Sequence, residues 1–119
     1  MHPNRLRSIS EGMRQFTATQ LEAYLQQTAE PPLLLDVREP WEFNVCHIPG
    51  SQLIPMRQIP AAATDMDTDA ETVVICHHGV RSFQVARFLE TELGFTNLIN
   101  LAGGVAAWAR DVDPKMPVY

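Results

Sequence analysis

The sequence lacks the features of several large classes of protein. It has no run of about 18 apolar residues, so we expect no membrane-spanning helix. Its first residues carry no apolar stretch of the kind found in secretory signal peptides. Basic residues number 9 against 14 acidic ones, and the net charge of −5 argues against nucleic acid as a partner. We therefore expect a cytoplasmic protein that binds neither membranes nor nucleic acid.

Cysteine is also scarce, and internal repeats and low-complexity segments are absent. The two cysteines are Cys46 and Cys76, and in a reducing compartment a disulfide between them is not expected. Each is either a catalytic thiol or a small buried apolar side chain. The chain has 119 residues, of which 45% are hydrophobic, which suits one domain with one core. We expect an N-terminal extension over 1–15 and a single domain over 16–119.

Short apolar runs alternate with helical patterns along the domain. A helix is predicted to begin at Thr17, which with Gln20 forms a capping box, and to end before Pro31. Further helices are predicted over 39–43, over 82–93 and after 103, with a short helix and a surface loop within 56–70. Strands are predicted over 33–35, 52–54, 72–75 and 97–101. This order predicts an α/β fold, with a parallel sheet flanked by helices on both faces.

Cys76 lies at the carboxyl end of the clearest strand, where ligands bind in such folds. The segment that follows must turn tightly into a helix, and Gly79 permits backbone angles that other residues avoid. A tight turn directs several backbone N–H groups inward, and the helix start adds its own free N–H groups. This arrangement favours a thiolate at Cys76, and the thiolate is the nucleophilic form of cysteine.

Arg81 adds a permanent positive charge whose planar fork matches an oxyanion. The same loop would also hold a persulfide, which is itself an anion. We therefore predict Cys76 as the catalytic nucleophile, with the rest of its loop as the substrate-binding residues. These are His77, His78, Gly79, Val80, Arg81 and Ser82.

Three stretches together resemble the rhodanese family, in the family's order. The first is Asp36 to Phe43 followed by His47 to Ser51, the second is Cys76 to Ser82, and the third is Leu101 to Trp108. The resemblance covers residues 17 to 110. It implies a five-stranded parallel sheet and transfer of a sulfane sulfur, from a donor such as thiosulfate, through a cysteine persulfide. The acceptor would be a thiol, cyanide or a protein, and no cofactor is implied.

Within this resemblance, Cys76 takes the catalytic role and Arg81 the position that binds the anionic donor. Four residues separate Cys76 from Arg81, whereas the related cell-cycle phosphatases carry one more, which favours sulfur over phosphoryl chemistry. Where the family often has arginine after the cysteine, this sequence has His77, and where it usually has glycine before the histidine, it has Cys46. A docking or sensing module, or a persulfide carrier for one partner, remains an alternative.

Other residues have simpler interpretations. A zinc site could be built from Cys46, His47, Cys76, His77 and His78. It is disfavoured, because adjacent ligands in one tight loop rarely reach the same metal. Cys46 is either a resolving thiol or, as we prefer, a packed and inert residue. A local network of ion pairs and caps is expected at Asp36, Arg38 and Glu39, and a hydrogen bond in a turn at His47. Trp41 and Trp108 are expected in the core.

Overall fold

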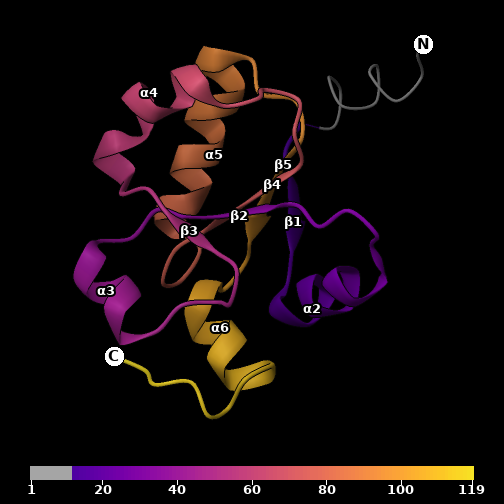
Figure 1. Ribbon diagram of the computed structural model, residues 1–119, viewed down its shortest axis with the longest axis vertical. Helices are drawn as coiled ribbons and strands as arrows, with labels where there is room; N and C mark the ends of the chain where they lie inside the picture. Colours follow the sequence, from indigo (N-terminus) through magenta and orange to yellow (C-terminus); the bar gives the residue numbers. More distant parts are fainter. Residues whose placement is uncertain (1–11) are drawn as a thin grey trace.

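A computed structural model describes residues 12–119, in which a parallel sheet of five strands lies between two groups of helices (Figure 1). The spatial order of the strands is β1 (Arg14–Phe16), β5 (Leu98–Leu101), β4 (Thr72–Ile75), β2 (Leu33–Asp36) and β3 (Gln52–Leu53). Every neighbouring pair is parallel. The predicted fold class is confirmed, and β4 lies at the centre of the sheet.

The helices connect the strands in the predicted alternation. They are α2 (Ala18–Gln27), α3 (Pro40–Val45), α4 (Ile59–Ala62), α5 (Val80–Leu93) and α6 (Gly104–Asp111), with 3-10 turns η1 (Met56–Gln58) and η2 (Ala63–Asp65) around α4. The capping box of α2 forms as expected, because the Gln20 N–H donates to Thr17 Oγ1 and the Thr17 N–H donates to Gln20 Oε1. Helix α5 begins two residues earlier than predicted, directly after Gly79. No helix in residues 12–119 is long and apolar enough to cross a membrane.

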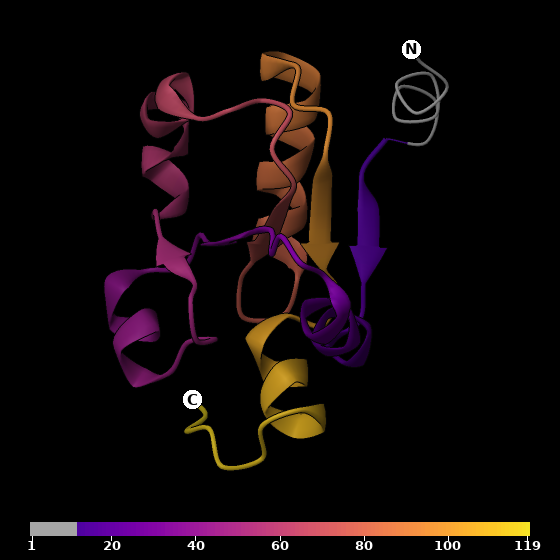
Figure 2. The same cartoon turned by 45° about the vertical axis from the view of Figure 1, so that its right-hand side comes forward.

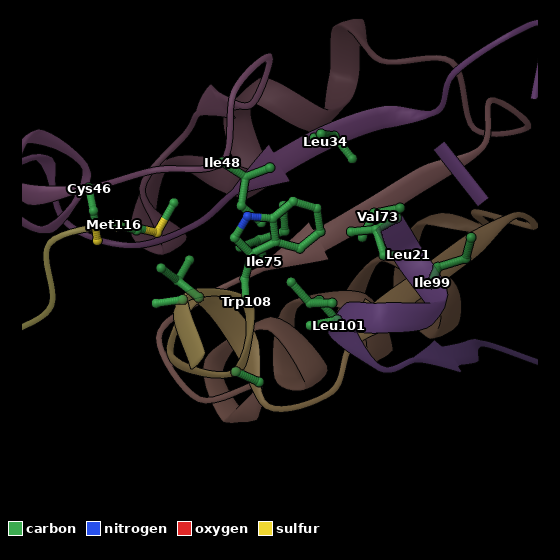
Figure 3. Close-up of a cluster of buried hydrophobic side chains, with 14 residues drawn as sticks. Leu21, Leu34, Cys46, Ile48, Val73, Ile75, Ile99, Leu101, Trp108 and Met116 are labelled. Atoms are coloured by element: carbon green, nitrogen blue, oxygen red, sulfur yellow. The ribbon is translucent and has the colours of Figure 1, made fainter. Parts of the chain in front are cut away.

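Each face of the sheet has its own apolar cluster, because successive side chains of a strand point to opposite faces. Val73 and Ile75 of β4 join the cluster under α2 and α6. In that cluster the Trp108 ring lies among Ile48, Ile75 and Val73, which confirms the prediction for this tryptophan (Figure 3). Val74 and Cys76 join the other cluster, under α5 and α4. A two-sided core therefore holds β4 rigidly, and Cys76 extends that rigid strand.

Two expectations need correction. Strand β1 includes Arg14 and Gln15, which the sequence assigned to the extension, and it pairs in parallel with β5. Most of the expected extension lies outside the described residues. Trp41 is not in the core: 58% of its surface is exposed, and its ring packs edge-on against Tyr119, with centroids 5.2 Å apart. Its position on the first turn of the short helix α3 directs it away from the sheet.

Candidate active site

The candidate nucleophile is held by backbone amides at the start of α5. The Gly79 N–H donates to Cys76 Sγ at 3.1 Å, and the Ser82 N–H donates to it at 3.3 Å. The Cys76 thiol in turn lies 3.4 Å from the Ser82 hydroxyl oxygen. Only 1% of Cys76 is exposed, so these groups supply its polar surroundings in place of water. Charge-stabilising N–H groups aimed at a buried sulfur are what an anionic thiolate requires.

Gly79 makes this turn possible in two ways. Its φ of +95° lies in the left-handed region, which side chains disfavour. A Cβ at this position would also lie 3.0 Å from the Gly103 nitrogen and 3.1 Å from the Leu101 oxygen. The loop therefore approaches the chain after β5 so closely that only glycine fits.

The stretch from Leu101 to Trp108 holds the same loop through backbone hydrogen bonds. The Val105 N–H donates to the Cys76 carbonyl at 2.9 Å, and the Ala106 N–H donates to the His77 carbonyl at 3.0 Å. A Cβ on Gly104 would collide with these two carbonyls. Free N–H groups in the first turn of α6 thus fix the backbone at Cys76 and at the residue that follows it.

Asn100 is a site residue that the sequence analysis missed. Its Oδ1 accepts from the Ser82 hydroxyl at 2.5 Å, and its Nδ2 donates to the Gly79 carbonyl at 3.2 Å. The same Nδ2 donates to Gln15 Oε1 on β1 at 3.0 Å. The available signal was a polar residue inside an otherwise apolar strand, since a buried amide needs partners. Asn100 of β5 therefore connects the loop to β5 itself and, through Gln15, to the edge strand β1.

Arg81 contacts a carboxylate that the sequence analysis did not assign to the site. Its Nη1 and Nη2 donate to Glu42 Oε1 and Oε2 at 2.8 and 2.9 Å, a bidentate pair across α3 and α5. Glu42 Oε1 also accepts from the Glu39 N–H at 2.8 Å. Hydrogen bonds from Arg81 lower the pKa of Glu42 to about 2, against the opposing effect of burial. The same hydrogen bonds raise the pKa of Arg81, so both groups remain charged.

Tyr119 joins this pair to a second, fully buried pair. Arg38 donates hydrogen bonds from Nε and Nη2 to the Asp36 carboxylate, the shortest at 2.7 Å. Neither side chain has any exposed surface. Arg38 Nη1 donates to the Tyr119 hydroxyl at 2.8 Å, and that hydroxyl donates to Glu42 Oε2 at 2.8 Å. The chain end lies beside α3, as Figures 1 and 2 both show. The expected local network of ion pairs and caps is confirmed: Asp36 pairs with Arg38, and Glu39 is the N-cap of α3 and also pairs with Arg57.

The two histidines of the loop stack on one another and on this tail. The His77 ring lies 4.0 Å from the His78 ring and 4.1 Å from the Tyr119 ring, measured between centroids. Burial, with repulsion from His78, lowers the pKa of His77 and so favours its neutral form. His78 and Val80 are exposed, with 64% of Val80 accessible. The loop thus surrounds Cys76 with the backbone amides of Gly79 and Ser82, and its one arginine is paired with Glu42.

The remaining candidates lie away from this site. Cys46 is 7% exposed and packs in the apolar cluster beside Met116 (Figure 3). His47 Nδ1 hydrogen-bonds to the Phe43 carbonyl at 2.9 Å, as predicted for a turn. Within residues 12–119, no group of three or more histidine, cysteine or acidic side chains is placed to share a metal ion.

Comparison with known proteins identifies the family of this chain. A family model described as "Rhodanese-like domain" matches residues 17–111. A sulfurtransferase of Allochromatium vinosum is 37% identical over 81 residues, covering 68% of this chain and 75% of that protein. A rhodanese-like/PpiC domain-containing protein of Arabidopsis thaliana is 32% identical over 125 residues, which span all of this chain but only 42% of the plant protein.

A solved structure shows the same fold. The crystal structure of a rhodanese-like domain protein from Staphylococcus aureus superposes with a TM-score of 0.73 at 31% identity, covering 81% of this chain and 91% of that one. The family match spans most of the chain, including α3, the loop from Cys76 to Ser82 and the first turns of α6. The chain therefore belongs to the rhodanese-like domain family.

Proposed function

We propose that the protein is a sulfurtransferase in which Cys76 carries sulfur as a persulfide. The observation that supports this most strongly is the pair of N–H groups, from Gly79 and Ser82, that point at the Cys76 sulfur at 3.1 and 3.3 Å. The same two donors can stabilise a thiolate before the reaction. After the reaction they can stabilise the persulfide, which has the same charge.

The reaction has two half-steps, and thiosulfate is the simplest donor. The Cys76 thiolate attacks the outer sulfur of the donor, a new S–S bond forms, and the donor's own S–S bond breaks with its electron pair leaving on sulfite. In the second step a thiolate, cyanide or a protein cysteine attacks the outer sulfur of the persulfide. The electron pair of that S–S bond then returns to Cys76. Neither half-step requires a redox cofactor, since each transfers a sulfur atom between nucleophiles.

A persulfide carrier that serves one protein partner is the second candidate. The small exposed fraction of Cys76, at 1%, is compatible with it, because bulky acceptors are excluded whereas an extended cysteine side chain of a partner is narrow enough to reach the sulfur. Carrier and enzyme share the first half-step and differ in the second. The carrier releases its sulfur slowly to small thiols and cyanide.

The proposal is tested by intact mass after incubation with a sulfur donor, on the wild type and on Cys76→Ser. We expect the wild type alone to gain one sulfur atom and to lose it on addition of cyanide or dithiothreitol. Loss within the mixing time indicates an enzyme, and slow loss indicates a carrier. A wild type that gains no sulfur from any donor would refute both candidates and leave a docking module.

A further inference from the structure

The charges around Cys76 cancel, although the loop contains an arginine. Arg81 is paired bidentately with Glu42, a carboxylate that is 4% exposed. Arg38 is paired in the same way with Asp36, at 0% exposure for both. Arg81 of α5 and Arg38 of the chain after β2 therefore each have their own anion.

Two further side chains near these ion pairs, Tyr119 and His77, add no positive charge that would attract an anionic donor. Tyr119 is protonated, because burial and the hydrogen bond to Glu42 outweigh Arg38 and raise its pKa to about 12. The lowered pKa of His77 favours its neutral form. Once Cys76 is a thiolate, the two ion pairs and the thiolate together carry one negative charge, which the backbone N–H dipoles of the loop oppose.

Glu42 is held firmly in this neutralising position. Its two carboxylate oxygens accept four hydrogen bonds: two from Arg81, one from the Glu39 N–H and one from the Tyr119 hydroxyl. An incoming anion cannot displace a carboxylate that has four donors and almost no contact with water without a large loss of hydrogen-bond energy. Arg81 therefore meets a donor as half of a neutral pair, offering hydrogen bonds from its remaining N–H groups.

We propose that Glu42 is a specificity-determining residue, which makes the site favour sulfane-sulfur donors with one negative charge, such as a persulfide, over dianionic thiosulfate. This inference rests on the proposed function of Cys76. A persulfide anion R–S–S⁻ reacts by the same route: the Cys76 thiolate forms a new S–S bond to the outer sulfur, the S–S bond of the donor breaks, and R–S⁻ leaves with the electron pair. The negative charge of the donor's outer sulfur stays on the transferred sulfur of the Cys76 persulfide.

Two donors of nearly equal shape isolate the charge. The methanethiosulfonate anion, CH₃SO₂S⁻, differs from thiosulfate by a methyl group in place of one charged oxygen. We would measure the rate of persulfide formation on Cys76 with each donor, as kcat/KM, with Cys76→Ser as the background. The variants are Glu42→Gln and, as a matched control, Glu39→Gln. Glu39 lies three residues before Glu42 and pairs with Arg57, so the control removes the same charge from a different ion pair.

We expect Glu42→Gln to raise kcat/KM for thiosulfate about tenfold and for methanethiosulfonate about threefold, since the added attraction scales with donor charge. Glu39→Gln should change neither rate by more than about twofold, because an exposed pair is screened by water. Equal changes for both donors, or a lower thiosulfate rate in Glu42→Gln, would overturn the inference. A wild type that accepts sulfur from neither donor refutes the proposed function instead.

If Glu42→Gln melts well below the wild type, the salt dependence of the wild type gives the answer. Loading by thiosulfate should speed up as salt rises, and more steeply than loading by methanethiosulfonate, because salt screens repulsion from a negative site. Slower loading by thiosulfate at higher salt would mean a net positive site and would overturn the inference.

Discussion

Both cysteines of this protein are buried, but they differ in what surrounds their sulfur atoms. Cys46 is 7% exposed and Cys76 is 1% exposed. Cys46 Sγ lies among apolar side chains and has no hydrogen bond within residues 12–119, although its carbonyl accepts from Arg38. Cys76 Sγ has the Gly79 and Ser82 N–H groups as partners. Burial therefore does not distinguish an inert thiol from a candidate nucleophile, whereas directed donors do.

The difference between the two cysteines also explains why the backbone must be fixed around Cys76 but not around Cys46. Cys46 tolerates small shifts, because apolar contacts have no direction. The Cys76 loop is fixed by the first turn of α6, by Asn100 and by the left-handed Gly79, which all act on its backbone. N–H donors stabilise an anion only when their direction is held in advance.

Turnover should separate the two cysteines most strongly. With thiosulfate or a persulfide as donor and cyanide or a thiol as acceptor, Cys76→Ala should lose about a thousandfold or more in kcat/KM, because no nucleophile remains. Cys46→Ala should keep its rate within about twofold and lose about 1–2 kcal/mol of stability to the small cavity. A Cys46→Ala variant that folds but has lost turnover would show that the buried thiol takes part.

Distorting the loop should have the next largest effect. Gly79→Ala should lower kcat/KM about 10- to 100-fold and destabilise the protein by about 1–3 kcal/mol, because it adds both a positive-φ penalty and a close contact with Gly103. Gly94→Ala is the matched control, with φ of +73° and open space around its Cβ. It should cost about 1 kcal/mol and leave the rate unchanged. Equal rates for both variants would contradict the proposed role of the turn.

The ion pair beside Cys76 should give a pH-dependent contribution to stability. The pKa of Glu42 is lowered from its usual 4.5 to about 2 in the folded state, so its contribution is complete above about pH 4.5 and is lost as the pH falls toward 2. At pH 6 the wild type should exceed Glu42→Gln by about 2 kcal/mol in free energy of unfolding. Chemical denaturation at several pH values should show this gap closing below pH 4.5. A gap that stays constant down to pH 2.5 would contradict the assignment.

Removing one side-chain contact to the sulfur should have the smallest effect. Ser82→Ala leaves both N–H donors in place but deletes the hydroxyl between Cys76 and Asn100. We expect persulfide formation to slow about three- to tenfold, because the variant loses the Ser82–Asn100 hydrogen bond that helps to hold the N–H donors of the loop in place. Single-turnover loading measured by quenched-flow mass analysis checks this. A rate equal to that of the wild type would mean that the backbone donors suffice.

Sequence reasoning succeeded where one short stretch determines its own structure. The apolar run 72–75 could be assigned to a buried strand, and the Gly79 turn and the helix after it follow from local chemistry. The N–H donors at Cys76 could be predicted because a strand, a tight turn and a helix that follow one another in the chain are sufficient to place them. Trp108 and the capping box at Thr17 were predictable for the same reason.

It failed where the partner lies far away along the chain. Glu42 meets Arg81 across 39 residues and Tyr119 across 77, and no local pattern marks either contact. Strand β1 is only three residues long, so it shows no alternation, and its place in the sheet depends on β5. Trp41 was misplaced because its size favoured the core, whereas the short helix α3 turns it outward onto Tyr119.

The most direct test of the central claim is to locate the transferred sulfur in the wild-type protein, where both cysteines compete. After brief incubation with a persulfide donor, the persulfide is trapped by alkylation and mapped by tandem mass spectrometry of the peptides that contain Cys46 and Cys76. Directed N–H donors predict the added sulfur on Cys76 alone. Sulfur on Cys46, or in similar amounts on both, would contradict the claim that these donors select the nucleophile.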